Sequence, residues 1–411
     1  MKTAYRSLVL KYNLLLLPSG GAEKIPTLLK LQEEFSRWAT EWALSGGRAP
    51  PPQNNPLKYF ARNFLYAGRA LDWLRGLKKG LKKNVEVRKM QPPLLFDAQL
   101  RLGKERDVSR GVFIDLPLRE VRVRKWGSTL ALPLTEKAAE WILARVREGG
   151  RLALAAVWVG PGSRNAKLHV ALIFRREVVS MQARRLLVVD FNALHNGVSY
   201  AVVEGDKIIT KGVLRPNVSK IAHMQKVVSK LDSVCAKKDK VCDAAMATKS
   251  RVWRLLRVWE DEAARKLIRL ALQYKAAILV DLPKGKSIMK LKEVYVSEKK
   301  IFLNFGRLWE SLRGLAEWHG VPCHSARLYS TICPHCERKM SILQGRRVRC
   351  ACGFEANRDE VPALWAAKLF PKLSSFSSPF PLRRPRPLLF AEVNSLKIRA
   401  DSGTALPAWE D

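Results

Sequence analysis

Four cysteines in the C-terminal part of the chain constrain its fold more than any other feature. Cys333 and Cys336 form a Cys-x-x-Cys pair, and after thirteen residues Cys350 and Cys352 form a Cys-x-Cys pair. Two cysteine pairs on two tight turns, joined by a short basic hairpin, suit tetrahedral Zn²⁺. The segment is therefore predicted to be a zinc ribbon. Its second pair is shorter than the usual Cys-x-x-Cys, which leaves His335 as an alternative ligand.

The chain has seven cysteines, an odd number, and its charge is strongly positive. Clustered, unpaired cysteines indicate metal binding in a reducing compartment, here taken as the cytoplasm, and not a disulfide framework. The 411 residues include 74 Lys and Arg against 37 Asp and Glu, a net charge of +37. Repulsion at this level opposes compaction unless a polyanion neutralises it, and nucleic acid is the obvious polyanion. No apolar run approaches the roughly 20 residues of a membrane span.

Two groups of basic residues are candidates for contact with nucleic acid. One group is at the end of a predicted helix: Lys78, Lys79, Lys82 and Lys83. The other is spaced by threes on a later predicted helix, so that its members are expected to share a face: Arg251, Arg254 and Arg257. Such runs also occur simply as solvated faces, but the global charge favours contact with phosphates.

Hydrophobic periodicity divides the chain into segments of different texture. Residues 1–20 and 100–180 are rich in short β-type runs, and residues 21–99 between them are predominantly helical. This pattern predicts a β-rich platform that carries a helical lobe. Residues 181–328 contain a three-strand meander, a long helical region and a continuous apolar run typical of a buried parallel strand. Residues 373–411 are rich in Pro, Ser and Arg and are expected to form a flexible tail.

Two of the most apolar strands end in an aspartate. The run LLVVD ends in Asp190, and AILVD ends in Asp281. An unpaired carboxylate beside core residues costs on the order of several kcal/mol unless a cation compensates it. Asp359 lies at the start of a predicted helix, where a simple N-cap is the alternative role. Three such acids would suit Mg²⁺ or Mn²⁺, and two such ions can promote hydrolysis of a phosphodiester.

The order of these features resembles the C-terminal half of TnpB proteins and miniature type V CRISPR effectors. In this chain, as in that family, two acids come first, then the cysteine pairs, then a third acid. The segment YSTICPHC, residues 329–336, is similar to the family's Tyr-Thr-Ser-x-x-Cys-x-x-Cys. The segment CGFEANRD, residues 352–359, is similar to its Cys-Gly-x-x-x-Asp-Arg-Asp. The resemblance spans residues 185–370, and the N-terminal half matches only in size and texture.

The resemblance implies an α/β protein with an RNase H-like (RuvC) domain, formed by residues 181–328 and 356–372. A zinc ribbon, residues 329–355, is inserted into it, and the N-terminal half would be a β-barrel-like wedge domain with a helical recognition lobe. The implied activity is that of an RNA-guided DNA endonuclease. Its cofactors would be Mg²⁺ or Mn²⁺ and Zn²⁺, and its partners a guide RNA and double-stranded target DNA. The implied catalytic residues and magnesium ligands are Asp190, Asp281 and Asp359.

The sequence departs from the family pattern near the acids. Asp281 stands where the family usually has Glu, and the Asn that usually follows the third acid is missing from Glu360–Ala363. The alternative is therefore a catalytically impaired RNA-guided DNA-binding protein. A transposase that acts without RNA is a weaker hypothesis, because the chain lacks a His-rich metal motif with a nucleophilic Tyr.

Overall fold

The computed structural model separates the described residues into two compact units, one within residues 3–177 and the other formed by residues 1–2 and 178–374. We call them the N-terminal and C-terminal units and describe each by itself. Apart from a few single positions, the residues that the structure describes are 1–14, 22–45, 55–66, 93–103, 111–124, 129–160, 167–191, 197–236, 243–281, 305–326 and 328–374. The expected lysine group at 78–83 and the expected tail beyond residue 374 lie outside these ranges.

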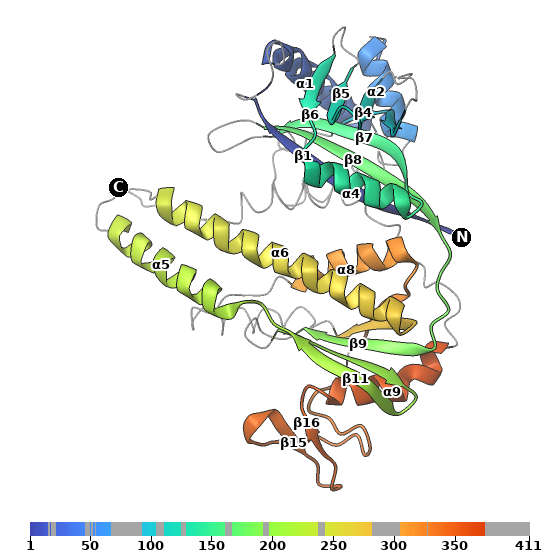
Figure 1. Ribbon diagram of the computed structural model, residues 1–411, viewed down its shortest axis with the longest axis vertical. Coiled ribbons are helices and arrows are strands. Elements are labelled where there is room, and N and C mark those ends of the chain that lie inside the picture. The colour runs from blue at the N-terminus through green and yellow to red at the C-terminus, as the bar shows by residue number, and fades with distance from the viewer. Residues whose placement is uncertain are drawn as a thin grey trace. The chain divides into compact units, whose positions relative to one another are not determined.

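The N-terminal unit contains two four-stranded sheets (Figure 1). The first has the order β1-β8-β7-β2, built from β1 (Lys2–Asn13), β8 (Lys167–Val178), β7 (Arg151–Gly160) and β2 (Leu94–Phe96). The second has the order β3-β4-β5-β6, built from β3 (Ala98–Arg101), β4 (Val112–Asp115), β5 (Glu120–Val123) and β6 (Leu130–Pro133). The β-rich texture predicted for residues 100–180 is thus observed in this unit.

The described residues of the N-terminal unit include the helices α1 (Ile25–Leu44), α2 (Asn55–Tyr66) and α4 (Glu136–Arg147). A short 3-10 turn, η2 (Ala22–Lys24), precedes α1. Aromatic rings join α1 to α2, since Phe35 lies 6.2 Å from Phe60 between ring centroids. Phe60 in turn lies 5.0 Å from Phe96 of β2. The strand β2 pairs with β7, so residues 94–99, which the sequence assigned to the helical lobe, belong to the sheets. The strand β2 has only three residues, so its apolar run is too short to be recognised as a strand from the sequence. Its strand conformation depends on pairing with the distant strand β7.

The C-terminal unit is built on a mixed five-stranded sheet of order β11-β10-β9-β12-β13. Its strands are β9 (Arg185–Phe191), β10 (Val198–Glu204), β11 (Lys207–Leu214), β12 (Ala276–Asp281) and β13 (Cys323–Ala326). The predicted meander β9–β10–β11 is antiparallel, and a tight turn at Gly205 and Asp206 joins β10 to β11. The strands β12 and β13 run parallel to β9. The predicted buried parallel strand is therefore confirmed.

Both faces of this sheet are covered (Figure 1). One face, with Leu187 and Ile278, packs against the helices α5 (Val218–Ala236), α6 (Asp243–Gln273) and α8 (Phe305–His319). The other face, with Val188 and Leu279, packs against helix α9 (Val361–Ser374) and the cysteine-containing segment. Because alternate residues point to opposite faces, β9 and β12 need apolar side chains at nearly every position.

An ion-pair cluster joins α6 to α8. Glu260 is only 2% exposed, and its Oε2 lies 3.1 Å from Nε of Arg307. A terminal nitrogen of Arg307 also lies 3.0 Å from Oδ2 of Asp261. The hydroxyl of Ser311 donates to the other carboxylate oxygen of Asp261 at 3.1 Å. This cluster holds the helical layer together beneath the central strands.

The cysteine-containing segment forms a small three-stranded sheet of order β14-β15-β16. Its elements are β14 (Ser341–Ile342), the 3-10 turn η4 (Gln344–Arg346), β15 (Arg347–Arg349) and β16 (Glu355–Asn357). Helix α9 follows it and continues past Pro371 to Ser374. Among the described residues, no helix combines the length and apolar character that crossing a membrane requires.

The turn into β10 yields a test of the sheet. Gly197 has φ +74°, and a Cβ there would lie 2.2 Å from the carbonyl oxygen of Leu214. Gly205 has φ +58° but open space around it, so it is a matched control for backbone conformation alone. We expect Gly197→Ala to lower the free energy of unfolding by about 2 kcal/mol or more, and Gly205→Ala by only about 1 kcal/mol. Urea denaturation measures both, and equal losses would contradict the register of β10 with β11.

Candidate active site and metal centre

Asp190 and Asp281 are register partners on the two central parallel strands. The pairing of β9 with β12 aligns Val188 with Leu279, Val189 with Val280, and then Asp190 with Asp281. Neighbouring strands lie about 4.8 Å apart, so the two carboxylates emerge side by side at the same edge of the sheet. Both residues are half-buried, and they point to the face that carries α9.

The surroundings of this pair hold it in place. The backbone N–H of Leu328 donates to Oδ1 of Asp281 at 3.2 Å. Ser199 of β10, only 6% exposed, is the register partner of Asp190 on its other side. Two adjacent carboxylates repel each other and are costly to desolvate, and a bound cation offsets both terms. Their oxygen donors are of the kind that Mg²⁺ and Mn²⁺ prefer.

The third predicted acid, Asp359, lies in the turn between β16 and α9. Its backbone N–H donates to Oδ1 of Asn357 at 2.9 Å, which orders the turn. Helix α9 packs on β9 and β10, so Asp359 stands at the beginning of the helix that covers the carboxylate face. Within the described ranges, four cysteines are the one group of three or more ligands that could share an ion. The three aspartates therefore do not lie close enough together to share one ion. A site that holds two ions does not require all three acids to meet at one point.

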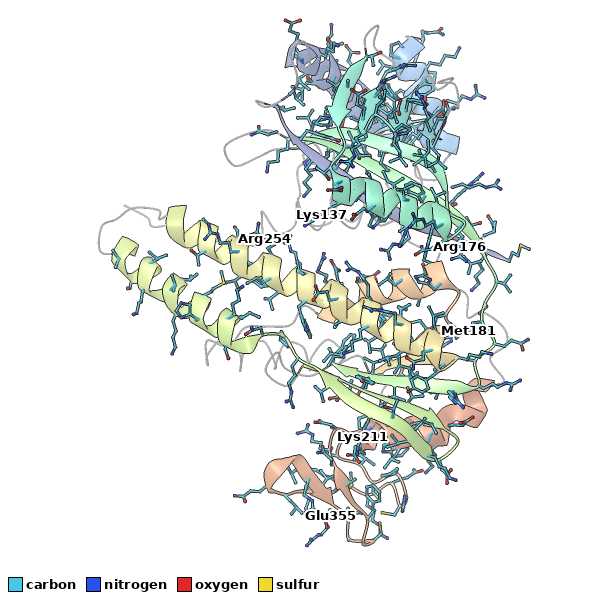
Figure 2. All side chains as sticks on the ribbon, in the orientation of Figure 1. Lys137, Arg176, Met181, Lys211, Arg254 and Glu355 are labelled. Carbon is cyan, nitrogen blue, oxygen red and sulfur yellow. The ribbon has the colours of Figure 1, made fainter. Side chains whose placement is uncertain are left out.

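Side-chain contacts anchor the beginning of α9. At its start, Oε1 of Glu360 lies 2.6 Å from Nζ of Lys211 on β11, whose position Figure 2 labels. One turn later, the indole N–H of Trp365 donates to the carbonyl of Ile332 at 2.8 Å. The ring of Trp365 also lies 5.2 Å from that of Tyr329, between centroids. The sheet and the cysteine-containing segment thereby fix the entry to this helix.

The four predicted zinc ligands come together. Sγ of Cys333 lies 3.6 Å from Sγ of Cys352, and Sγ of Cys336 lies 3.3 Å from Sγ of Cys350. All four ligand atoms lie within 4.8 Å of one another. Zinc–sulfur bonds of about 2.3 Å in a tetrahedron place sulfurs about 3.8 Å apart, so the donor set fits Zn²⁺.

The two turns that carry the cysteines differ. In the first, the backbone N–H of Cys333 donates to the carbonyl of Arg338 at 2.8 Å. A hydrogen bond from the backbone of Arg338 lowers the pKa of the Cys336 thiol to about 7, which favours the thiolate that binds metal. In the second, Gly353 at φ +88° closes a tight turn by donating to the carbonyl of Cys350 at 3.0 Å. This conformation accommodates the shortened Cys-x-Cys spacing.

His335 is not part of the sulfur group. Its ring packs on that of Phe354, with centroids 4.7 Å apart. The four cysteines supply a complete tetrahedral set without it.

The predicted arginine face on α6 is corrected. Arg251 and Arg254 are exposed, and Figure 2 labels Arg254 on this helix, but Arg257 is half-buried. Steps of three residues fall about 60° short of a full turn, so Arg257 lies about 120° around the helix from Arg251. Only the first two arginines therefore share an exposed face.

The sequence alone did not identify three residues near the carboxylates as parts of a site. Ser199 could have been found as a hydroxyl within an otherwise apolar strand, two residues after Gly197. Lys211 and Glu360 are 149 residues apart, and no local pattern relates them.

Comparison with solved structures shows a likeness of fold. The cryo-EM structure of a Cas12f1–sgRNA–target DNA complex matches with a TM-score of 0.50 and 11% identity, over 83% of this chain and 81% of that one. CasPhi-2 (Cas12j) bound to crRNA matches with a TM-score of 0.36 and 10% identity, over 92% and 99% of the two chains. A CRISPR-Cas12f ternary complex matches at 0.33 and 11%, over 84% and 81%. No protein-family model and no curated protein sequence matches the chain.

The sulfur group leads to a prediction about metal content. We expect the purified protein to hold about one zinc ion per chain, and Cys350→Ser to weaken zinc binding by more than about 100-fold, because three thiolates cannot complete the tetrahedron. Zinc can be quantified by mass spectrometry after dialysis against a weak chelator.

Two variants serve as controls for this experiment. Cys323→Ala removes a cysteine of β13 that lies outside the sulfur group, and His335→Ala removes the alternative ligand. Both should retain zinc. Loss of the metal in His335→Ala would instead assign a ligand role to that histidine.

Proposed function

We propose that this chain is an RNA-guided DNA endonuclease of the type formed by TnpB proteins and miniature type V CRISPR effectors. The observation that carries the proposal is the register of Asp190 with Asp281 at the ends of the two central parallel strands. Such a pair on adjacent strands, facing a helix that begins just after a third acid, suits a site that hydrolyses phosphodiester bonds.

The sheet supports assignment to the RNase H-like (RuvC) class. Three antiparallel strands are followed by two parallel strands, and helices cover both faces. The acids lie at the C-terminal ends of the first and fourth strands, Asp190 as the second-to-last residue of β9 and Asp281 as the last residue of β12. The likeness to the Cas12f1 protein at a TM-score of 0.50 supports the same fold. That protein was solved with sgRNA and target DNA, and by analogy we assign a guide RNA and double-stranded DNA as partners of this chain. The net charge of +37 is in keeping with two polyanionic partners.

The proposed chemistry divides between the metal ions and the chain. Asp190, Asp281 and Asp359 would hold Mg²⁺ or Mn²⁺, which when bound activates water and neutralises charge on the scissile phosphate. The backbone N–H of Leu328 orients the carboxylate of Asp281. The ion pair of Lys211 with Glu360 holds the first turn of α9, and thereby Asp359, over the sheet. The positive end of the dipole of α9 adds to the attraction for phosphate at this edge.

Substitution of the paired acids tests the site. We expect Asp190→Ala and Asp281→Ala each to lower the rate of Mg²⁺-dependent cleavage of a target duplex by more than about 100-fold, with binding of RNA retained. Asp206→Ala, which removes an exposed acid in the turn between β10 and β11, should leave cleavage unchanged. Asp281→Glu should remain active, because a longer carboxylate still reaches a bound ion. Unchanged cleavage in Asp190→Ala would refute the assigned site.

Co-purification tests the guided mode of action. The chain would be expressed together with its flanking DNA, and any bound RNA sequenced. We expect one discrete RNA and a metal-dependent cut in a duplex that matches it. Absence of a bound RNA would refute guidance.

The alternative function, RNA-guided DNA binding without cleavage, is favoured by one observation. The Asn usual after the third acid is absent, and Glu360 at that turn is engaged by Lys211. Tight binding of the matched duplex with no product in Mg²⁺ or Mn²⁺ would establish this alternative.

A further inference from the structure

Two arginines face each other at one end of the β7–β8 ladder. Arg151, the first residue of β7, is the register partner of Arg175 on β8, and both side chains are exposed. Directly opposed residues of an antiparallel pair have Cβ atoms about 4.5–5.5 Å apart, and like charges there are destabilising. The fold therefore places two cations in a position that disfavours the folded state of the protein alone.

Nearby carboxylates do not relieve this repulsion. Oε1 of Glu148, in the turn before β7, lies 2.8 Å from a guanidinium nitrogen of Arg145. Oε1 of Glu177, two residues after Arg175, accepts a hydrogen bond from the hydroxyl of Thr3 at 2.8 Å. Within the described part of the chain, neither Arg151 nor Arg175 has an acidic group at ion-pair distance.

Further arginines lie at the same end of the ladder. Arg147 is exposed in the last turn of α4. The chain then reverses through Gly149 at φ +82° and enters β7 at Arg151. Arg176, labelled in Figure 2, reaches back to this turn, since its Nε lies 3.9 Å from the position a Cβ of Gly149 would take. Arg151 and Arg175 point to the other face of the ladder from Phe174, which contacts Trp141 of α4. We call the exposed, directly opposed residues Arg151 and Arg175 the arginine cluster.

We propose that the arginine cluster binds the phosphodiester backbone of a nucleic acid. A guanidinium group donates two parallel hydrogen bonds to a phosphate, and a phosphate between two guanidinium groups turns their repulsion into attraction. The proposal rests on the proposed function in one respect, the identification of the polyanion as a nucleic acid. It adds a binding surface in the N-terminal unit, on residues distinct from the carboxylates and the cysteines.

Salt-dependent binding tests this surface. The variants are Arg151→Gln, Arg175→Gln and the double variant, and the probes are a fluorescein-labelled RNA hairpin and a DNA duplex of equal length, titrated without divalent metal. We expect each single variant to weaken binding about 3- to 10-fold at about 0.1 M salt. On the duplex, the slope of log affinity against log salt should fall by about 0.9 for each phosphate that the variant no longer neutralises.

A matched control separates a local interaction from bulk charge. Arg37→Gln removes the same charge from an exposed arginine of α1 whose guanidinium lies 3.7 Å from Glu33. It should leave affinity and slope nearly unchanged. An equal loss of affinity in Arg37→Gln would overturn the proposal, and so would an unchanged affinity of the double variant for both probes. A loss of affinity confined to the RNA hairpin or to the DNA duplex would support the surface and name its partner.

Stability gives a second, opposite readout. Removing one of two opposed cations should raise the midpoint of thermal unfolding of the nucleic-acid-free protein at low salt, and the gain should fade near 1 M salt, where screening acts within about 3 Å. A variant that is both more stable and a weaker binder separates the surface from a folding defect. A lower midpoint at low salt would overturn the assignment of repulsion to this pair. Neither readout involves cleavage, so an inactive carboxylate site would not affect them.

Discussion

The parallel pairing of β9 with β12 is the interaction on which the C-terminal unit depends. It joins strands separated by the α5–α6 segment, and it brings Asp190 beside Asp281. A slip of one residue would turn the carboxylate of Asp281 away from Asp190 and into the layer packed by α6 and α8. Burial of apolar side chains on both faces, at about 25 cal/mol per Å², makes that slip costly. The core thus determines the position of the charged pair at its edge.

Helix α9 connects this edge to the sulfur group. At the beginning of α9, Glu360 forms an ion pair with Lys211 of the sheet. The indole N–H of Trp365 in α9 donates a hydrogen bond to the carbonyl of Ile332, next to Cys333. A metal held by the four sulfurs would order the turn around Cys333 and, through Trp365, the beginning of α9. A zinc ion at this position would therefore influence the placement of Asp359 from outside the proposed carboxylate site. Surface ion pairs alone contribute little, so the buried indole contact carries more of this coupling.

Local patterns were enough to predict part of this arrangement. Apolar strands ending in Asp190 and Asp281, and the four cysteines, are visible in short windows of sequence. The strand register, Ser199 opposite Asp190, and the ion pair of Lys211 with Glu360 depend on pairing between distant segments, which no window contains. The prediction that Arg257 shares a face with Arg251 was wrong for a different reason. A helix has 3.6 residues per turn, so each step of three residues rotates the side chain away from the first position, and the rotation adds up over two steps. The short strand β2 was missed because its identity depends on β7.

The excess of positive charge relates folding to binding. With 74 cationic side chains and 37 acidic ones, at most half of the cations can form one-to-one ion pairs. The remainder raise the free energy of the compact state, as at the opposed pair Arg151 and Arg175. A polyanion that binds only the folded chain lowers that free energy by mass action, and the effect grows with the logarithm of the ratio of its concentration to its dissociation constant. In the proposed complex, the same cations that weaken the isolated protein would stabilise the bound state, so stability and nucleic-acid affinity would oppose each other at these positions.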